Sequence, residues 1–195
     1  FIVQRKRNIS ITITSSQSGD GKTFISTNLA GLYAMSGRPT LLLDMDIRKP
    51  NVHDKLGFEA KLGVTNYLIG DCELEDIIVH HEAFAFDVIP AGTIPPNPGE
   101  LIRSEKLTEL LEILRSRYDF IIIDCAPSLS LITINALAAV QGVIIPMQCE
   151  YYALEGLADL TQTIDRIQQV VNPNLEIVGV VRTMYDARNA LTRDV

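Results

Sequence analysis

Residues 9–23 read ISITITSSQSGDGKT, and this stretch decides the fold. Isoleucine alternates with serine or threonine from Ile9 to Thr14, which predicts a β-strand. The small residues from Ser15 to Gly21 predict a loop. The segment from Lys22 to about Ser36 predicts a helix that stops at Gly37, with Ile25, Leu29, Leu32 and Tyr33 on its apolar face. A loop between a strand and a helix places backbone N–H groups and a helix N-terminus around an anion, so we predict a phosphate-binding loop.

The phosphate loop supplies the first set of candidate site residues. The Lys22 side chain can reach the β- and γ-phosphates and act in catalysis, and the Thr23 hydroxyl can bind Mg²⁺. The strict motif has Gly where this chain has Ser16, so the alternative is an ordinary Gly-rich turn that caps a helix. The strand before the loop and the helix after it favour the phosphate loop. The residues expected to bind the nucleotide are Ser18, Gly19, Asp20, Gly21, Lys22, Thr23 and Phe24.

The rest of the chain alternates between short apolar strands and helices. Residues 48–85 are less regular, and the Pro-rich residues 90–98 predict an extended loop. Alternation of this kind predicts an α/β fold, a three-layer, doubly wound, mostly parallel sheet in which ligands bind at the carboxyl ends of the strands. We expect one nucleotide-binding domain over residues 1–195. The expected strands are 40–44, 86–91, 120–124, 142–146 and 177–181, and the expected helices follow the stripes at 107–114, 131–140 and 157–171.

Acidic residues end two of the buried strands. Asp44 follows TLLL and Asp46 comes two residues later, and Asp124 follows FIII. A carboxylate beside so much apolar surface is costly unless something compensates its charge, and Mg²⁺ takes a few carboxylates and completes its shell with phosphate and water. We assign Asp44 and Asp124 to the Mg²⁺ shell and Asp46 to the role of base or water-orienting group near the γ-phosphate. The alternative is that these residues are helix caps or solvated strand ends.

Composition narrows the class of protein. The chain has 195 residues, 47% of them hydrophobic, and a net charge of −7, which disfavours a disordered chain and attraction of the whole surface to nucleic acid. Three widely spaced cysteines give neither a disulfide framework nor a zinc motif, and no apolar run approaches the ~20 residues of a membrane span. We expect a cytoplasmic protein. Because the chain begins at Phe1 without Met, we expect it to be part of a longer one.

Together, the loop, the DMD strand end and the IIID strand end resemble the ParA/MinD class of P-loop ATPases. Residues up to about 126 are similar to the bacterial tyrosine autokinases of capsule and exopolysaccharide synthesis. This likeness lies in TSSQSGDGKT, in LLLDMDIRKP, in FDVIPAG with IPPNPGEL, and in YDFIIID. It implies ATP and Mg²⁺ as cofactors, transfer of the γ-phosphate to tyrosine, oligomerisation, and a membrane-anchored activator at the inner face of the membrane.

Residues from about 127 to the end resemble the ParA/Soj partition ATPases, in SLSLITINALAA, IPMQCEYYALEGLADL and NPNLEIVGVVRTMYDAR. This likeness implies a switch that dimerises on ATP, is reset by hydrolysis to ADP, and positions DNA or other cargo through an adaptor. Gln17 stands where partition ATPases have a signature Lys that acts on the partner's nucleotide. The sequence favours the kinase as the main hypothesis, with the partition switch as the alternative.

Overall fold

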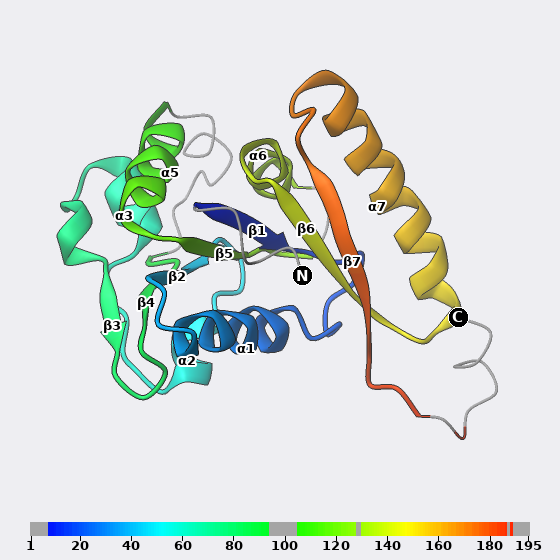
Figure 1. The fold of residues 1–195 in the computed structure, drawn as a ribbon, viewed down its shortest axis with the longest axis horizontal. Coiled ribbons are helices and arrows are strands. Elements are labelled where there is room, and N and C mark those ends of the chain that lie inside the picture. Colours follow the sequence, from blue (N-terminus) through cyan, green and yellow to red (C-terminus); the bar gives the residue numbers. More distant parts are fainter. Residues whose placement is uncertain (1–7, 94–104, 128–129, 187, 189–195) are drawn as a thin grey trace.

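The computed structural model describes residues 8–93, 105–127, 130–186 and 188. Within them the centre is a seven-stranded sheet in the order β3-β4-β2-β5-β1-β6-β7 (Figure 1). Every neighbouring pair is parallel except β3 and β4, which are antiparallel. The strands are β1 (Ile9–Ile13), β2 (Thr40–Asp44), β3 (Val79–His81), β4 (Phe86–Ile89), β5 (Phe120–Asp124), β6 (Gly142–Gln148) and β7 (Glu176–Thr183).

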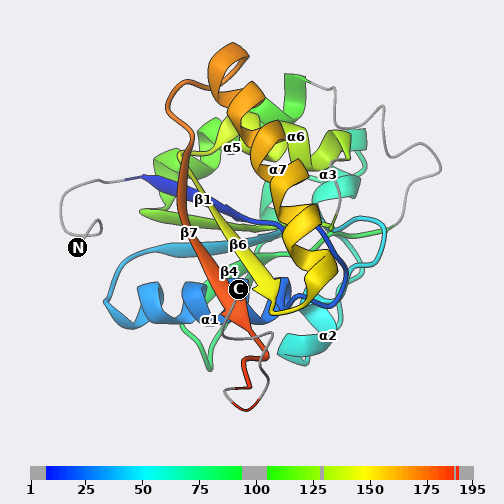
Figure 2. The same cartoon turned by 90° about the vertical axis from the view of Figure 1, so that its right-hand side faces the viewer.

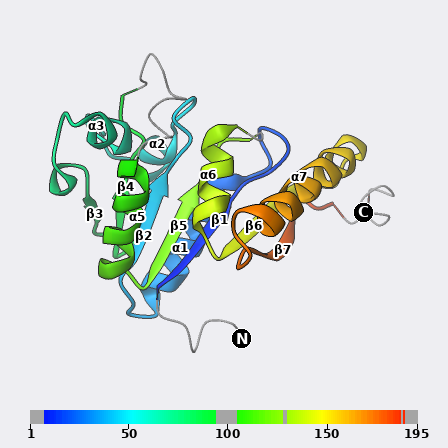
Figure 3. The ribbon, with the colours of Figure 1, turned by 90° about the horizontal axis from the view of Figure 1, so that it is seen from above.

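Helices cover both faces of the sheet. Seen from above in Figure 3, α5, α6 and α7 lie on the near side and α1 lies beyond the strands. This is the three-layer, doubly wound arrangement expected from the alternating pattern, and that prediction is confirmed. The helices are α1 (Lys22–Met35), α2 (Val52–Leu56), α3 (Val64–Ile69), the 3₁₀ turn η1 (Leu74–Asp76), α5 (Glu105–Arg117), α6 (Leu131–Ala139) and α7 (Tyr151–Val170).

Alternate residues of β2 and β5 belong to two separate hydrophobic cores, one on each face of the sheet. On β2, Leu42 packs on the side of α1, while Leu41 and Leu43 pack on the side of α5 and α6. Such short strands are almost wholly apolar because each face needs its own buried side chains.

Polar side chains on β1 are buried as well, because β1 lies inside the sheet, between β5 and β6, and helices cover both faces of that sheet. Ser10 and Thr12 are 0% exposed. The Ser10 hydroxyl accepts a bond from Arg115 Nε at 3.3 Å, and the Thr12 hydroxyl donates to the carbonyl of Ile123 at 3.4 Å. These partners let an alternating strand occupy the middle of the sheet.

Two expectations about the elements need correction. On α1, three of the four predicted apolar residues, Ile25, Leu29 and Tyr33, pack against the core, but Leu32 is 65% exposed. The most deeply buried side chains of this helix are small ones such as Ala30 and Ala34. Strand β3 was not predicted, because its three residues carry no strand periodicity and depend on pairing with β4. The end of the expected loop at 90–98 falls outside the described residues.

The carboxyl ends of the parallel strands lie along one edge of the sheet and position the candidate site. The phosphate loop follows β1 there, the Asp46 segment follows β2, and Met184 follows β7. Figure 2 shows β7 and β6 side by side at the border of the sheet, with α7 beside them.

Candidate functional site

The phosphate loop has the backbone geometry of an anion site. It leaves β1 at Ile13 and enters α1 at Lys22. Gly19 and Gly21 have φ angles of 91° and 86°, in the left-handed region that side-chain-bearing residues rarely adopt. Gly21 caps α1 without a side-chain hydrogen bond, so no side chain blocks the first N–H groups of the helix. The structure therefore offers these N–H groups to a phosphate.

Lys22 lies folded across this loop. Its Nζ donates to Ser15 Oγ at 2.9 Å and to the carbonyl oxygen of Gln17 at 2.8 Å. Burial lowers the pKa of Lys22, and the negative charge of Asp20 and of Asp124 opposes this effect. The ammonium is thus held at the loop by neutral oxygens that phosphate oxygens can replace.

Two side chains from distant strands brace the loop. Gln148, the last residue of β6, donates from Nε2 to the carbonyl of Gly19 at 3.2 Å. Thr183, the last residue of β7, donates from Oγ1 to the carbonyl of Asp20 at 3.0 Å. Neither residue is among those predicted for the site, although each lies just beyond the carboxyl end of a predicted strand, where ligands bind in such sheets.

Asp20 supports the loop from inside. It is 1% exposed, and its Oδ2 accepts the backbone N–H of Gln17 at 3.2 Å. Its Oδ1 is buried without a hydrogen-bond partner. The carboxylate faces the loop backbone, and Asp20 is absent from the wall of the pocket described below.

Asp44 and Asp124 are direct neighbours in the register of β2 and β5. Both are buried, and burial, followed by the Asp124 charge, raises the pKa of Asp44 well above its ordinary value. Asp44 Oδ1 accepts from the N–H of Asp46 at 3.0 Å, and Oδ2 accepts from the N–H of Val52 at 3.4 Å. Asp44 therefore braces the segment between β2 and α2.

Asp124 has more freedom to accept a ligand. Burial raises its pKa to about 6, while the hydroxyls of Thr23 and Ser26 and the charge of Lys22 oppose the shift. Its Oδ1 is buried without a partner. A cation carried in with a nucleotide would compensate this orphaned oxygen, and the Thr23 hydroxyl is the second donor that fits Mg²⁺.

Within the described residues, no cluster of three His, Cys, Asp or Glu side chains forms a metal cage. A Mg²⁺ ion here would thus need phosphate oxygens and water to complete its shell. The residues fit a nucleotide-borne ion better than a resident one.

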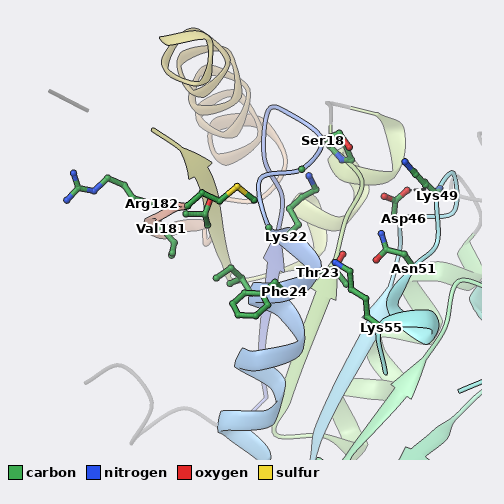
Figure 4. A pocket seen from close by; sticks show the side chains of 16 residues that line it. Ser18, Lys22, Thr23, Phe24, Asp46, Lys49, Asn51, Lys55, Val181 and Arg182 are labelled. Carbon is green, nitrogen blue, oxygen red and sulfur yellow. Dashed lines mark hydrogen bonds between the residues drawn. The ribbon is translucent and has the colours of Figure 1, made fainter. Parts of the chain in front are cut away.

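A pocket of about 650 Å³ opens over the phosphate loop (Figure 4). Asp46, Lys49, Asn51 and Lys55 lie along one wall, and residues 181–184 at the end of β7 lie along the other. Asp44 and Asp124 are not among the residues that line it. The predicted residues that line it are Ser18, Gly19, Gly21, Lys22, Thr23, Phe24 and Asp46.

Comparison with known proteins assigns the family. The family model described as an AAA domain matches residues 8–177. The chain is 43% identical over 190 residues to the sporulation initiation inhibitor protein Soj of Bacillus subtilis, an alignment that covers 93% of this chain and 74% of Soj. It is 41% identical over 195 residues to the chromosome partitioning protein ParA of Myxococcus xanthus, covering 95% and 68%. The chain belongs to the ParA/Soj family of P-loop ATPases.

Solved structures show the same fold. Cobyrinic acid a,c-diamide synthase from Mycobacterium smegmatis, with a bound ATP analogue and magnesium, superposes with a TM-score of 0.85 at 29% identity, over 95% of this chain and 79% of that one. The kinase domain of the Escherichia coli tyrosine kinase ETK superposes with a TM-score of 0.84 at 27% identity, over 93% and 70%.

Of the two resemblances seen in the sequence, the relatives support the one to ParA/Soj more strongly. The ParA/Soj likeness spans almost the whole chain, beyond the expected limit at residue 127. The tyrosine-kinase likeness rests on structures at lower identity. Among the described residues of this ParA/Soj-family chain, no helix has the length and apolar character needed to cross a membrane.

Proposed function

We propose that this chain is a Mg-ATP-dependent switch of the ParA/Soj type, which pairs with a second copy when ATP is bound and resets on hydrolysis. The observation that carries the proposal is the identity of about 40% to ParA and Soj over nearly the full chain, combined with a phosphate loop in binding geometry. The switch would act on cargo such as DNA through a partner protein, and residues 1–195 would act as one nucleotide-binding domain.

The predicted residues receive separate roles in this proposal. The N–H groups around Gly19 and Gly21 and the Lys22 ammonium bind the phosphates. Magnesium, when bound, would neutralise the phosphate charge, with Thr23 and Asp124 holding it and Asp44 holding the segment that follows β2. Asp46 lies in the pocket wall, where its carboxylate can accept a hydrogen bond from a water near the γ-phosphate.

A tyrosine kinase is the second candidate function. The side chain of Gln17 supplies no positive charge at the position of the partition ATPases' signature Lys. The backbone N–H of Gln17 donates to Asp20 Oδ2 and its carbonyl accepts from Lys22 Nζ, both contacts within the phosphate loop. The kinase domain of ETK shares the fold. Transfer of the γ-phosphate to tyrosine would use the same phosphate loop, so product analysis distinguishes the two functions.

The test is incubation with Mg-ATP, followed by measurement of phosphate release, oligomeric state and phosphotyrosine. The proposal predicts phosphate release and an ATP-dependent increase in mass to that of a dimer, measured by light scattering. It predicts no phosphotyrosine, with or without an added tyrosine peptide. A Gln17→Lys variant, which supplies the missing cation, is expected to release phosphate faster at protein concentrations that favour the dimer.

Phosphotyrosine that disappears in Lys22→Ala would instead support the kinase. A monomer that binds Mg-ATP and shows no pairing, no phosphate release and no phosphotyrosine would contradict both functions.

A further inference from the structure

Gly156 on α7 lies directly against the start of the phosphate loop (Figure 2). A Cβ atom built on Gly156 would lie 2.5 Å from the Cβ and 2.6 Å from the Oγ of Ser16. Carbon atoms that are not bonded to each other pack at about 3.5–4.0 Å, so no larger residue fits on α7 here while Ser16 keeps its place. The missing side chain of Gly156 therefore allows the helix and the loop to touch.

Rotation of the Ser16 side chain cannot make room for a larger residue. The Cβ of Ser16 is bonded directly to the main chain, and only the Oγ moves when the side chain changes rotamer. A Cβ added to Gly156 would thus displace the backbone of α7 or of the loop. The helix is held in place because Leu160, Ile164 and Ile167 belong to the hydrophobic core. The loop would therefore move, by about 1 Å.

The two neighbours of Ser16 in the chain hold the Lys22 ammonium. Its Nζ donates to Ser15 Oγ at 2.9 Å and to the carbonyl oxygen of Gln17 at 2.8 Å. A displacement of Ser16 moves both acceptors and so changes the point at which the ammonium meets a phosphate. The segment formed by β6 and α7 also reaches the loop through Gln148, and it therefore touches the loop at two points.

We propose that Gly156 is a positioning residue for the phosphate loop, because its missing side chain lets α7 lie against Ser16 and thereby fixes where Lys22 meets the phosphates. The inference rests on the proposed function, since it requires that Mg-ATP binds at the loop. Gly156 itself touches no part of the nucleotide and acts only through the loop. The position of α7 thus sets how tightly the loop binds the nucleotide.

The experiment measures Mg-ATP affinity by calorimetry for wild type and Gly156→Ala, at a temperature at which circular dichroism shows each protein to be folded. We expect a loss of about 10- to 100-fold for Gly156→Ala, because a misplacement of about 1 Å at a site can have an effect of this size. Gly31→Ala on α1 is the matched control, since a Cβ there makes only ordinary contacts, at 3.8 Å and 3.9 Å. It should keep the wild-type affinity.

Removal of the Ser16 side chain tests whether the contact itself causes the loss. When Gly156→Ala is combined with Ser16→Gly, the nearest atom left on residue 16 is its Cα, at 4.0 Å, which is an ordinary contact. This double variant should recover the affinity of Ser16→Gly alone. Gly156→Ala combined with Ser16→Ala should not, because the Cβ of residue 16 remains. A purely structural role for Gly156 predicts a lower melting temperature and an unchanged affinity in every folded variant.

An unchanged affinity in folded Gly156→Ala would overturn the inference, as would a loss that Ser16→Gly fails to repair. A Gly156→Ala variant that does not fold would also overturn it, because the contact would then serve folding and not the placement of the loop. A wild type that does not bind Mg-ATP would instead refute the proposed function.

Discussion

The carboxyl group of Asp124 is buried, and in the folded protein without ligand this burial disfavours its ionised form. Burial raises its pKa from 3.8 to about 6, so between these two pH values the folded state binds more protons than the unfolded state. The contribution of this group to stability is therefore present at low pH and is lost as the pH rises from about 4 to 6. Nucleotide-borne Mg²⁺ would reverse this preference by favouring the charged form.

This linkage gives a prediction for Asp124→Asn. Without nucleotide, the variant should be more stable than wild type by about 2–3 kcal/mol at pH 7 and equally stable near pH 4, as measured by urea denaturation. Phosphate release should be abolished in the same variant. Asp159→Asn, an exposed change on α7, is the control and should show neither effect. A variant less stable than wild type at pH 7 would show that Asp124 is ionised and well paired in the folded protein.

At the scale of single elements, α1 and the turn after it carry two glycines in contrasting environments. Gly31 lies inside α1, and a Cβ there would meet Phe84 at 3.8 Å and Phe86 at 3.9 Å, which are ordinary contacts. Gly37 follows the helix with φ at 76°, and no atom lies within 4 Å of a Cβ built there.

The two glycines should respond to alanine with opposite signs. We expect Gly31→Ala to stabilise the protein by about 0.5–1 kcal/mol, because alanine is the better helix former. Gly37→Ala should destabilise it by about 1 kcal/mol, because an L side chain disfavours the left-handed conformation. Denaturant titration of both variants measures the difference, and equal shifts of the same sign would contradict this account of α1.

Elements could be predicted from the sequence where their pattern is local. The buried stripe Leu107, Leu110, Leu111 and Leu114 and the apolar strand 120–124 are at their predicted places. On α1, Ile25, Leu29 and Tyr33 face the core as predicted, whereas Leu32 is exposed because close packing on the sheet selects small side chains at that part of the helix. Strand β3 depends on a partner strand, so no local pattern marks it.

The molecule as a whole brings together residues that no motif connects. The loop residues of the candidate site could be predicted, since strand, glycines and Lys22 are consecutive. Gln148 and Thr183 lie just beyond two predicted strands, but their contacts with the loop could not be predicted, because these depend on the order in which β1, β6 and β7 are placed in the sheet. Likewise, the sequence assigned Asp44 to the Mg²⁺ shell, and only the fold shows both of its oxygens bonded to backbone N–H groups.

The central claim is that Mg-ATP binds at the phosphate loop through Lys22. Calorimetric titration with Mg-ATP of wild type, Lys22→Ala and Lys106→Ala tests it most directly, with circular dichroism to confirm that each variant is folded. Lys106 lies on α5 and does not line the pocket, so Lys106→Ala removes the same positive charge as Lys22→Ala at a site remote from the loop. The account predicts binding by wild type and Lys106→Ala and a loss of at least about 100-fold in affinity for Lys22→Ala. Equal affinity in all three proteins would contradict it.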